Sequence, residues 1–127
     1  MAYCMTKVLA GAPEACEARA RAALGDQGFG ILTEIDVEAT LRAKLGAEIG
    51  AYKILGACNP AFAKGAIDLE PRIGVMLPCN VILRRVEGGT EVSVVDPVAS
   101  MAAIDNPALR AHAESVRNRL REAFERT

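Results

Sequence analysis

Apolar and polar residues follow one another along this chain in two different periods, which predict a mixture of strands and helices. Short apolar runs rich in β-branched residues predict strands at about residues 3–9, 30–35, 51–57 and 90–95. Residues 72–85 are also predicted to be extended, with a break at Pro78. Apolar residues spaced three or four apart predict helices at about residues 13–25, 37–45, 60–69 and 107–126. The glycine pair at 88–89 predicts a hairpin turn between the last two strands.

These elements predict a single α+β domain over residues 1–127, without an internal repeat or a linker. Because a hairpin joins antiparallel strands, we expect a mostly antiparallel or mixed sheet. The expected architecture is a two-layer sandwich with helices packed on one side of the sheet. The last helix carries an apolar stripe that we expect to cover the sheet, formed by Leu109, Ala113, Val116, Leu120 and Phe124.

The starts of three helices are marked by residues suited to a first turn. Asp36 and Asn59 are expected to cap the helices that follow them, because their side-chain oxygens accept hydrogen bonds from free N–H groups. Pro60 fits the first helical position, where a missing N–H group costs nothing. Asn106-Pro107 repeats this pattern before the last helix.

Composition and charge exclude several classes of function. Apolar residues make up 51% of the chain and charged residues 24%, which is typical of a globular protein. The net charge of −1 argues against a general binder of nucleic acids or anionic membranes, since both need a basic surface. The chain has no Trp and few Tyr or Phe, so a base-stacking platform is not expected. No apolar run is long enough to span a membrane.

The expected location is the cytoplasm. The N-terminal residues lack the basic start of a signal peptide and are better interpreted as a first strand. In the cytoplasm the four cysteines, Cys4, Cys16, Cys58 and Cys79, should be reduced thiols. No two of them have the Cys-x-x-Cys spacing of a zinc ribbon or a thioredoxin-like site.

Two short cysteine motifs are the candidate site: Cys58-Asn59-Pro60 and Pro78-Cys79-Asn80. Cys58 is expected just before a helix N-terminus, where free N–H groups and the helix dipole favour a negatively charged thiolate. Cys58 and Cys79 are therefore the candidate catalytic residues. Asn59, Pro60 and Pro78, which flank them, are the candidate binding residues.

The position of Cys79 relative to Cys58 depends on the connection between their strands. A strand–helix–strand crossover would return the chain to about the level of Cys58, with Cys79 at the end of the second strand. Pro78 would then mark an edge or a bulge, because proline cannot donate to a strand ladder. His112, the single histidine, is expected at the surface or at the border of the last helix's apolar stripe.

A set of residues spread along the chain forms one pattern. It comprises Gly28-Phe29, Glu34-Ile35-Asp36, Lys44, Tyr52, Ile54 to Pro60, Ile73-Gly74, Leu77-Pro78-Cys79, Asp96-Pro97 and Met101. Taken together, these residues resemble the domain-of-unknown-function family 302. The resemblance implies a compact α+β fold with an antiparallel or mixed sheet and a homodimer, and it implies no established activity.

Three functional hypotheses stay open at this point. In the first, Cys58 is an activated thiolate and Cys79 a second thiol, in disulfide exchange, persulfide carriage or peroxide sensing with a small-molecule or thiol partner. In the second, Cys58, Cys79 and Met101 bind copper(I), a soft ion that prefers sulfur ligands; otherwise no metal or cofactor is expected. In the third, the cysteines only pack inside a small-ligand-binding or structural module. A homodimer is expected in each case, because two-fold dimers are the commonest oligomers.

Overall fold

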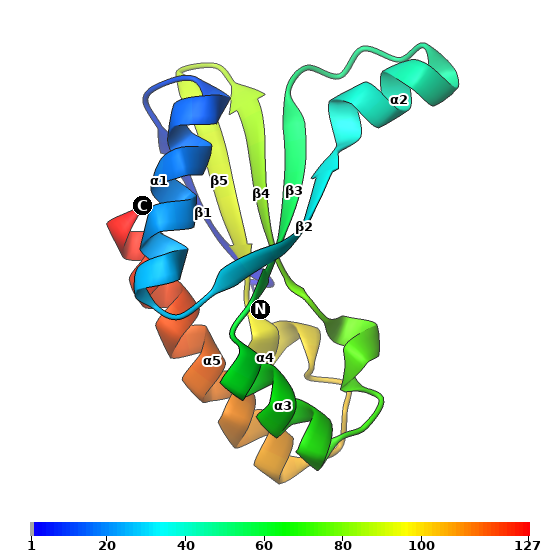
Figure 1. Ribbon diagram of the computed structural model, residues 1–127, viewed down its shortest axis with the longest axis vertical. Helices are drawn as coiled ribbons and strands as arrows, with labels where there is room; N and C mark the ends of the chain where they lie inside the picture. The colour runs from blue at the N-terminus through cyan, green and yellow to red at the C-terminus, as the bar shows by residue number, and fades with distance from the viewer. Residues whose placement is uncertain (1) are drawn as a thin grey trace.

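A computed structural model describes residues 2–127 of the chain and shows one five-stranded sheet (Figure 1). All neighbouring strands are antiparallel, and their order across the sheet is β1-β5-β4-β3-β2. The strands are β1 (Cys4–Leu9), β2 (Gly30–Asp36), β3 (Tyr52–Cys58), β4 (Cys79–Val86) and β5 (Gly89–Val95). The antiparallel sheet and the β4–β5 hairpin at residues 88–89 were both predicted from the sequence and are confirmed.

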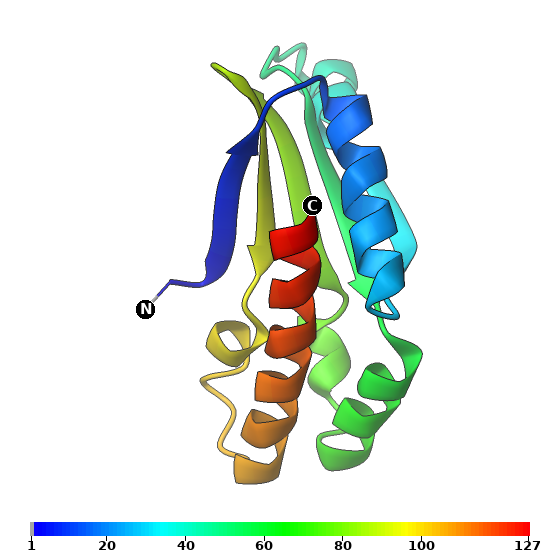
Figure 2. The same cartoon turned by 90° about the vertical axis from the view of Figure 1, so that its left-hand side faces the viewer.

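The two longest helices cover one face of the sheet. They are α1 (Pro13–Asp26) and α5 (Pro107–Arg126), which lie side by side in front of the strands in Figure 2. The shorter helices are α2 (Val37–Leu45), α3 (Pro60–Leu69), the 3-10 helix η1 (Ile73–Met76) and α4 (Pro97–Ser100). The α+β class and the placement of the last helix are thus confirmed. Within residues 2–127 no helix is both long and apolar enough to cross a membrane.

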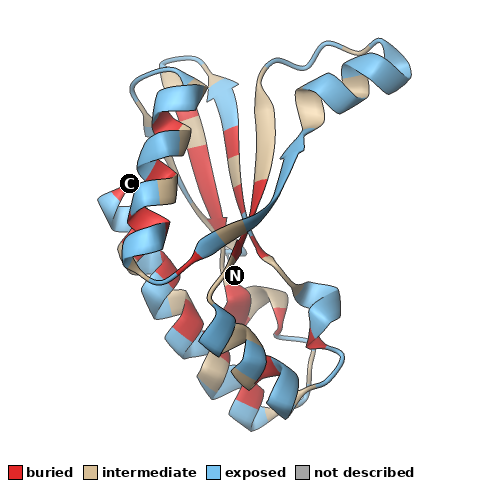
Figure 3. Cartoon of the chain, viewed as in Figure 1, coloured by how far each residue is buried: buried red, intermediate tan, exposed pale blue. Residues whose placement is uncertain are grey.

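The main core cluster lies between the sheet and these two helices, and Figure 3 colours many residues of the strands and of α1 and α5 as buried. Side chains alternate along each strand, so that one set faces the helices and the other faces away. On the helix side, Leu55, Val81 and Val92 are fully buried. Helix α1 contributes Cys16, Ala20, Ala23 and Leu24. Helix α5 contributes Val116, Leu120 and Phe124 of its predicted stripe, together with Ala123, which the stripe did not include.

The predicted helix starts are confirmed by their hydrogen bonds. The side chains of Asp36, Asn59 and Asn106 accept hydrogen bonds from the backbone N–H groups of Ala39, Phe62 and Leu109. Pro60 and Pro107 occupy the first turns of α3 and α5. These caps are local in sequence, which is why the sequence predicts them reliably.

The prediction for residues 72–85 was wrong in its first half. Residues 73–76 form η1, and β4 begins only at Cys79. Ile73 is completely buried and packs in a second core cluster with Val98, Leu109 and other residues below the sheet, so this segment turns instead of extending. The helix α4, capped by Asp96, was not predicted.

The strand–helix–strand crossover considered for Cys58 and Cys79 does not occur. Helix α3 and η1 bring the chain back to the end of the sheet that it left, so β4 runs antiparallel to β3 and lies directly beside it. Cys79 is therefore the first residue of its strand and not the last. This turn places Cys79 beside the end of β3, and therefore brings the two candidate cysteine motifs together.

Helix α2 extends away from the rest of the molecule (Figure 1). None of its residues is buried, and Leu45 at its end is 75% exposed. Because α2 does not pack on the helix-covered face, the sandwich has fewer covering helices than the sequence predicted. Within residues 2–127, no helix covers the face of the sheet opposite α1 and α5.

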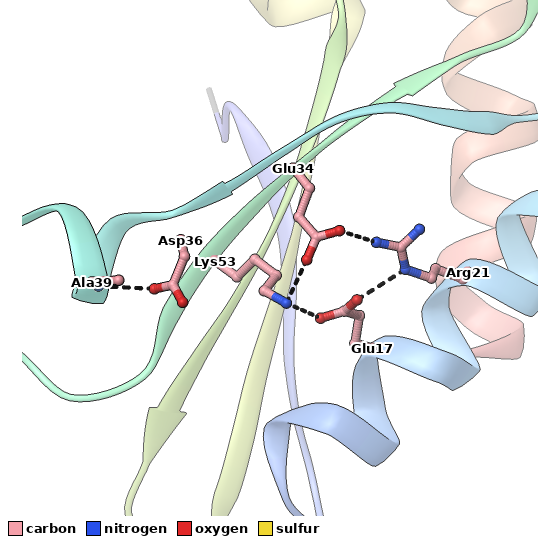
Figure 4. A network of polar contacts seen from close by, with 6 residues as sticks. All are labelled: Glu17, Arg21, Glu34, Asp36, Ala39 and Lys53. Atoms are coloured by element: carbon pink, nitrogen blue, oxygen red, sulfur yellow. Dashed lines mark hydrogen bonds and ion pairs between the residues drawn. The ribbon is translucent and has the colours of Figure 1, made fainter.

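Four charged side chains join helix α1 to strands β2 and β3 (Figure 4). The Lys53 ammonium contacts Glu17 at 2.9 Å and Glu34 at 2.7 Å. The Arg21 guanidinium contacts the same two carboxylates at 2.9 and 2.8 Å. Each charge thus has two opposite charges beside it, an arrangement that stabilises more than an isolated surface pair does.

Replacing Lys53 by Met should make the fold less sensitive to acid. The Lys53 ammonium, and then Arg21, holds the pKa of the Glu34 carboxyl below its ordinary value of 4.5. A carboxyl with a lowered pKa stabilises the folded state above its unfolded-state pKa, and that stabilisation is lost as the pH falls through the folded-state pKa. The difference in unfolding free energy between pH 7 and about pH 3, measured by urea titration, should therefore be smaller in Lys53→Met.

The control is Lys64→Met, which removes an isolated pair with Asp68 on the exposed side of α3. This variant should keep the pH dependence of the wild type. Equal changes in the two variants would show that the four-residue network has no special part in acid stability.

Candidate functional site

A cavity of about 330 Å³ lies at the end of the sheet where β3 ends and β4 begins. Helices α3 and α5 form one side of it, and the first half of β2 and the segment before β4 form the other. Most of its lining is apolar. The lining residues are Phe29, Leu32, Thr33, Ala57, Cys58, Asn59, Phe62, Ala63, Ala66, Leu77, Pro78, Cys79, Met101, His112, Ala113 and Val116.

Small residues keep this space open. Ala57 comes from β3, Ala63 and Ala66 from α3, and Ala113 from α5, so three elements that converge here present methyl groups only. Protein interiors are normally packed as densely as organic crystals, and side chains usually fill such gaps. The convergence of alanines therefore leaves room for a ligand.

Gly56 allows the helix-free side of the cavity to form. A Cβ atom at this position would lie 2.1 Å from the Thr33 hydroxyl oxygen and 2.6 Å from Pro78 Cγ. These two side chains therefore sit over the strand only because residue 56 has no side chain. Both residues line the cavity, and Leu32 beside them is 69% exposed, which places an apolar residue at its rim.

The two candidate cysteines both line this cavity. The sheet register pairs Cys79 with Ala57, so Cys79 is one position away from Cys58 on the neighbouring strand. In a regular sheet such residues point to opposite faces. They reach the same cavity because it opens at the end of the sheet, with Val116 on the helix side and Pro78 on the other.

The two thiols have different surroundings. Cys79 is 7% exposed, and burial, followed by the nearby Cys58, raises the pKa of its thiol to about 11. At neutral pH Cys79 is therefore protonated and a poor nucleophile. Cys58 is only half-buried and stands just before the N-cap Asn59 of α3, as the sequence predicted.

Asn59 connects the helix start to the other side of the cavity. Its side-chain oxygen accepts a hydrogen bond from Phe62 N at 3.3 Å, and its Nδ2 donates to the Gln27 carbonyl at 3.5 Å. Both polar atoms are thus engaged within the protein. Pro60, in contrast, does not line the cavity; it is exposed and begins α3.

His112 lies at the border of the α5 stripe, as expected, and it also lines the cavity, which the sequence did not indicate. Its Nε2 is 2.7 Å from the Phe62 carbonyl oxygen. Its ring meets the Phe62 ring edge-on at 5.6 Å, and Phe62 in turn lies 6.5 Å from Phe29. The one signal in the sequence was Gly65, a glycine inside the predicted helix 60–69.

Met101 follows α4 and lines the cavity together with Cys58 and Cys79, so the three proposed sulfur ligands share one space. Among residues 2–127, no three His, Cys, Asp or Glu side chains gather closely enough to hold a metal ion. A copper(I) site would therefore depend on the two thiols and the thioether.

Comparisons with known proteins establish the family. A family model described as a domain of unknown function, DUF302, matches residues 5–127. The chain belongs to this family. A crystal structure of an uncharacterized conserved DUF302 protein from Bacillus stearothermophilus has the same fold, with a TM-score of 0.93 and 24% sequence identity over 99% of this chain and 98% of the other. No functionally curated protein matches. The function of this DUF302 chain must therefore be argued from its cavity.

Replacing Asn59 by Ala should lower the free energy of unfolding by about 1 kcal/mol, because an N–H group at the start of α3 loses its acceptor. Urea titration monitored by circular dichroism measures this loss. Asn59→Asp retains the capping oxygen and should cost less. If Asn59→Ala were as stable as the wild type, the cap would not hold the helix start beside Cys58.

Proposed function

We propose that this DUF302 protein binds a small apolar molecule in the cavity and presents the Cys58 thiol to it. The observation that carries the proposal is a cavity of about 330 Å³ that has a mostly apolar lining and a half-buried thiol, Cys58, in its wall. Small-molecule sites in proteins are typically apolar hollows with a few placed polar groups. A dry cavity of about 150 Å³ holds one benzene ring, so this one suits a two-ring compound or a medium-length acyl chain.

The surroundings of the thiols support a reactive role for Cys58 in preference to Cys79. Cys58 is more accessible and precedes a helix N-terminus, which stabilises negative charge. Cys79 has a raised pKa and, by strand alternation, points away from Cys58, which does not favour a disulfide between them. Sulfur handling by Cys58 alone, such as carriage of a persulfide, fits these surroundings better than disulfide exchange in which Cys79 resolves a bond formed at Cys58. Copper(I) binding by Cys58, Cys79 and Met101 stays a prediction.

The test is protection of Cys58 by an apolar probe. Without ligand, iodoacetamide should modify Cys58 faster than the buried Cys16 and Cys79. Saturating 2-methylnaphthalene should slow the modification of Cys58 and leave that of Cys4 unchanged. Cys4 is an internal control, because it is equally half-buried but lies outside the cavity. Peptide mapping by mass spectrometry after timed alkylation gives each rate.

A matched pair of variants locates the effect. Ala63→Phe places a ring in the cavity and should abolish both probe binding and protection. Ala61→Phe makes the same change on an exposed position of α3 outside the cavity and should leave them intact. If the probe did not bind, or if it slowed Cys58 and Cys4 equally, the proposed function would be wrong.

We also propose that the chain acts as a homodimer in a reducing compartment, the cytoplasm, where its four thiols stay free. Support for the dimer comes from the sheet face without a covering helix. It presents apolar and aromatic side chains from four strands and the N-terminal segment, including Tyr3, Val8, Ile35, Tyr52 and Ile82. Exposed apolar patches of this kind mark interaction surfaces.

Light scattering should give the mass of a dimer for the wild type. Ile82→Glu, at the centre of the helix-free face, should shift the mass to that of a monomer, because it would bury a charge between the subunits. Ile67→Glu, on an exposed position of α3, is the control and should remain dimeric. A monomeric wild type at high protein concentration would contradict the proposal.

A further inference from the structure

Helix α3 has a glycine in its interior where the His112 ring packs. A Cβ atom at position 65 would lie 2.8 Å from His112 Cε1 and 3.4 Å from its Nε2. Glycine in a helix interior is less stable than alanine, because it has more backbone freedom to lose. The chain thus gives up helix stability at the one place where the imidazole must approach α3 closely.

The hydrogen bond of His112 fixes which ring nitrogen is protonated. The Phe62 carbonyl can only accept, so Nε2, 2.7 Å away, is the donor. In the neutral ring Nδ1 then carries a lone pair. Among residues 2–127 no donor bonds to Nδ1. The His112 ring is therefore held in the tautomer with the proton on Nε2, and its acceptor Nδ1 has no partner within residues 2–127.

Few polar groups of the cavity remain free for a ligand. Asn59 Oδ1 accepts from Phe62 N, and Nδ2 donates one of its two N–H groups to the Gln27 carbonyl, so the group that Asn59 still offers is a donor. The thiols are weak hydrogen-bonding groups. The Thr33 hydroxyl at the open rim can rotate to suit either role. Among the ring and amide acceptors of the lining side chains, His112 Nδ1 is the one without a hydrogen-bond partner within residues 2–127.

The same part of the cavity is rich in aromatic rings. Phe29 and Phe62, two of the three phenylalanines of the chain, lie beside each other with ring centroids 6.5 Å apart and an interplanar angle of 35°. His112 stands edge-on to Phe62, at 79°. Tilted and edge-on arrangements of this kind are also favourable for an aromatic guest.

We infer that the ligand is an uncharged aromatic molecule with one hydrogen-bond donor, a hydroxyl or an N–H group, which donates to His112 Nδ1. This inference rests on the proposed binding function and names the ligand class of the same cavity. His112 is then a ligand-binding residue, Gly65 provides the space for its ring, and the Phe62 carbonyl sets its tautomer. Phe29 and Phe62 contact the aromatic body of the ligand.

The test compares two probes of the same shape, 2-naphthol and 2-methylnaphthalene, in the wild type and in His112→Phe. The substitution keeps an aromatic ring at this position and removes the acceptor. The chain has no Trp, so the fluorescence of the probes can be followed without tryptophan background. One neutral hydrogen bond corresponds to about a fivefold change in affinity. We expect His112→Phe to weaken 2-naphthol about fivefold relative to 2-methylnaphthalene.

A measurement on the wild type makes the test independent of how the variant folds. In ¹⁵N-labelled protein, 2-naphthol should move the Nδ1 resonance of His112, and 2-methylnaphthalene should leave it nearly unchanged. A merely structural His112 would affect both probes alike.

The outcomes separate the two proposals. If neither probe binds the wild type, the proposed binding function is wrong, and the inference about His112 falls with it. If both bind but the ratio of their affinities is the same in His112→Phe and the Nδ1 resonance does not move, only the inference about His112 is overturned.

Discussion

The pairing of β3 with β4 is the constraint on which the candidate site depends. It places Ala57 opposite Cys79, and this register brings the two cysteine motifs, which lie about twenty residues apart in the sequence, to the same end of the sheet. A slip of one residue would turn every side chain of β4 to the other face. Val81 and Leu83, both buried against the helices, would then be exposed, so the burial of the core also fixes the position of Cys79.

The cavity lies where the main core cluster gives way to a second, smaller one. The main cluster lies between the sheet and the helices α1 and α5. The smaller cluster lies beyond the end of the sheet, around Ile73 and Leu109. Helix α5 passes through both clusters, which makes it the element that joins them. Between them, alanines and Gly56 keep side chains short, and the space that they leave is lined by rings and thiols. The domain is thus loosely packed at the cavity and closely packed in the two core clusters on either side of it.

Two polar features hold the borders of this space. The network of Glu17, Arg21, Glu34 and Lys53 attaches the edge strand β2 to α1, and β2 carries Thr33 over the cavity. At the other border, Asn59 and Arg119 both donate to the Gln27 carbonyl, at 3.5 and 3.4 Å. These contacts fix the position of the cavity walls, and a site with fixed walls discriminates between ligands by shape.

The sequence by itself determined the features that depend on neighbouring residues. Helix starts at Asp36, Asn59 and Asn106 were predictable because a capping side chain bonds to a backbone group only a few residues away. The strand alternation and the stripe of α5 were predictable because burial repeats with the period of each element. From these the α+β class, the hairpin and the position of Cys58 before a helix followed directly.

The tertiary structure alone decided the features that depend on distant residues. Residues 73–76 are mostly apolar and therefore favour a strand locally, but they turn because Ile73 is buried with residues of α4 and α5. The antiparallel placement of β4, the shared cavity of Cys58 and Cys79, and the docking of His112 on Gly65 each join segments far apart in the chain. Hydrophobic periodicity predicts which face of an element is buried, but it does not predict which element packs against that face. The pKa of the Cys79 thiol depends on this packing, because burial raises it. The chemistry of the site was therefore visible in the sequence as residue types, and its geometry was settled only by the packing of the whole domain.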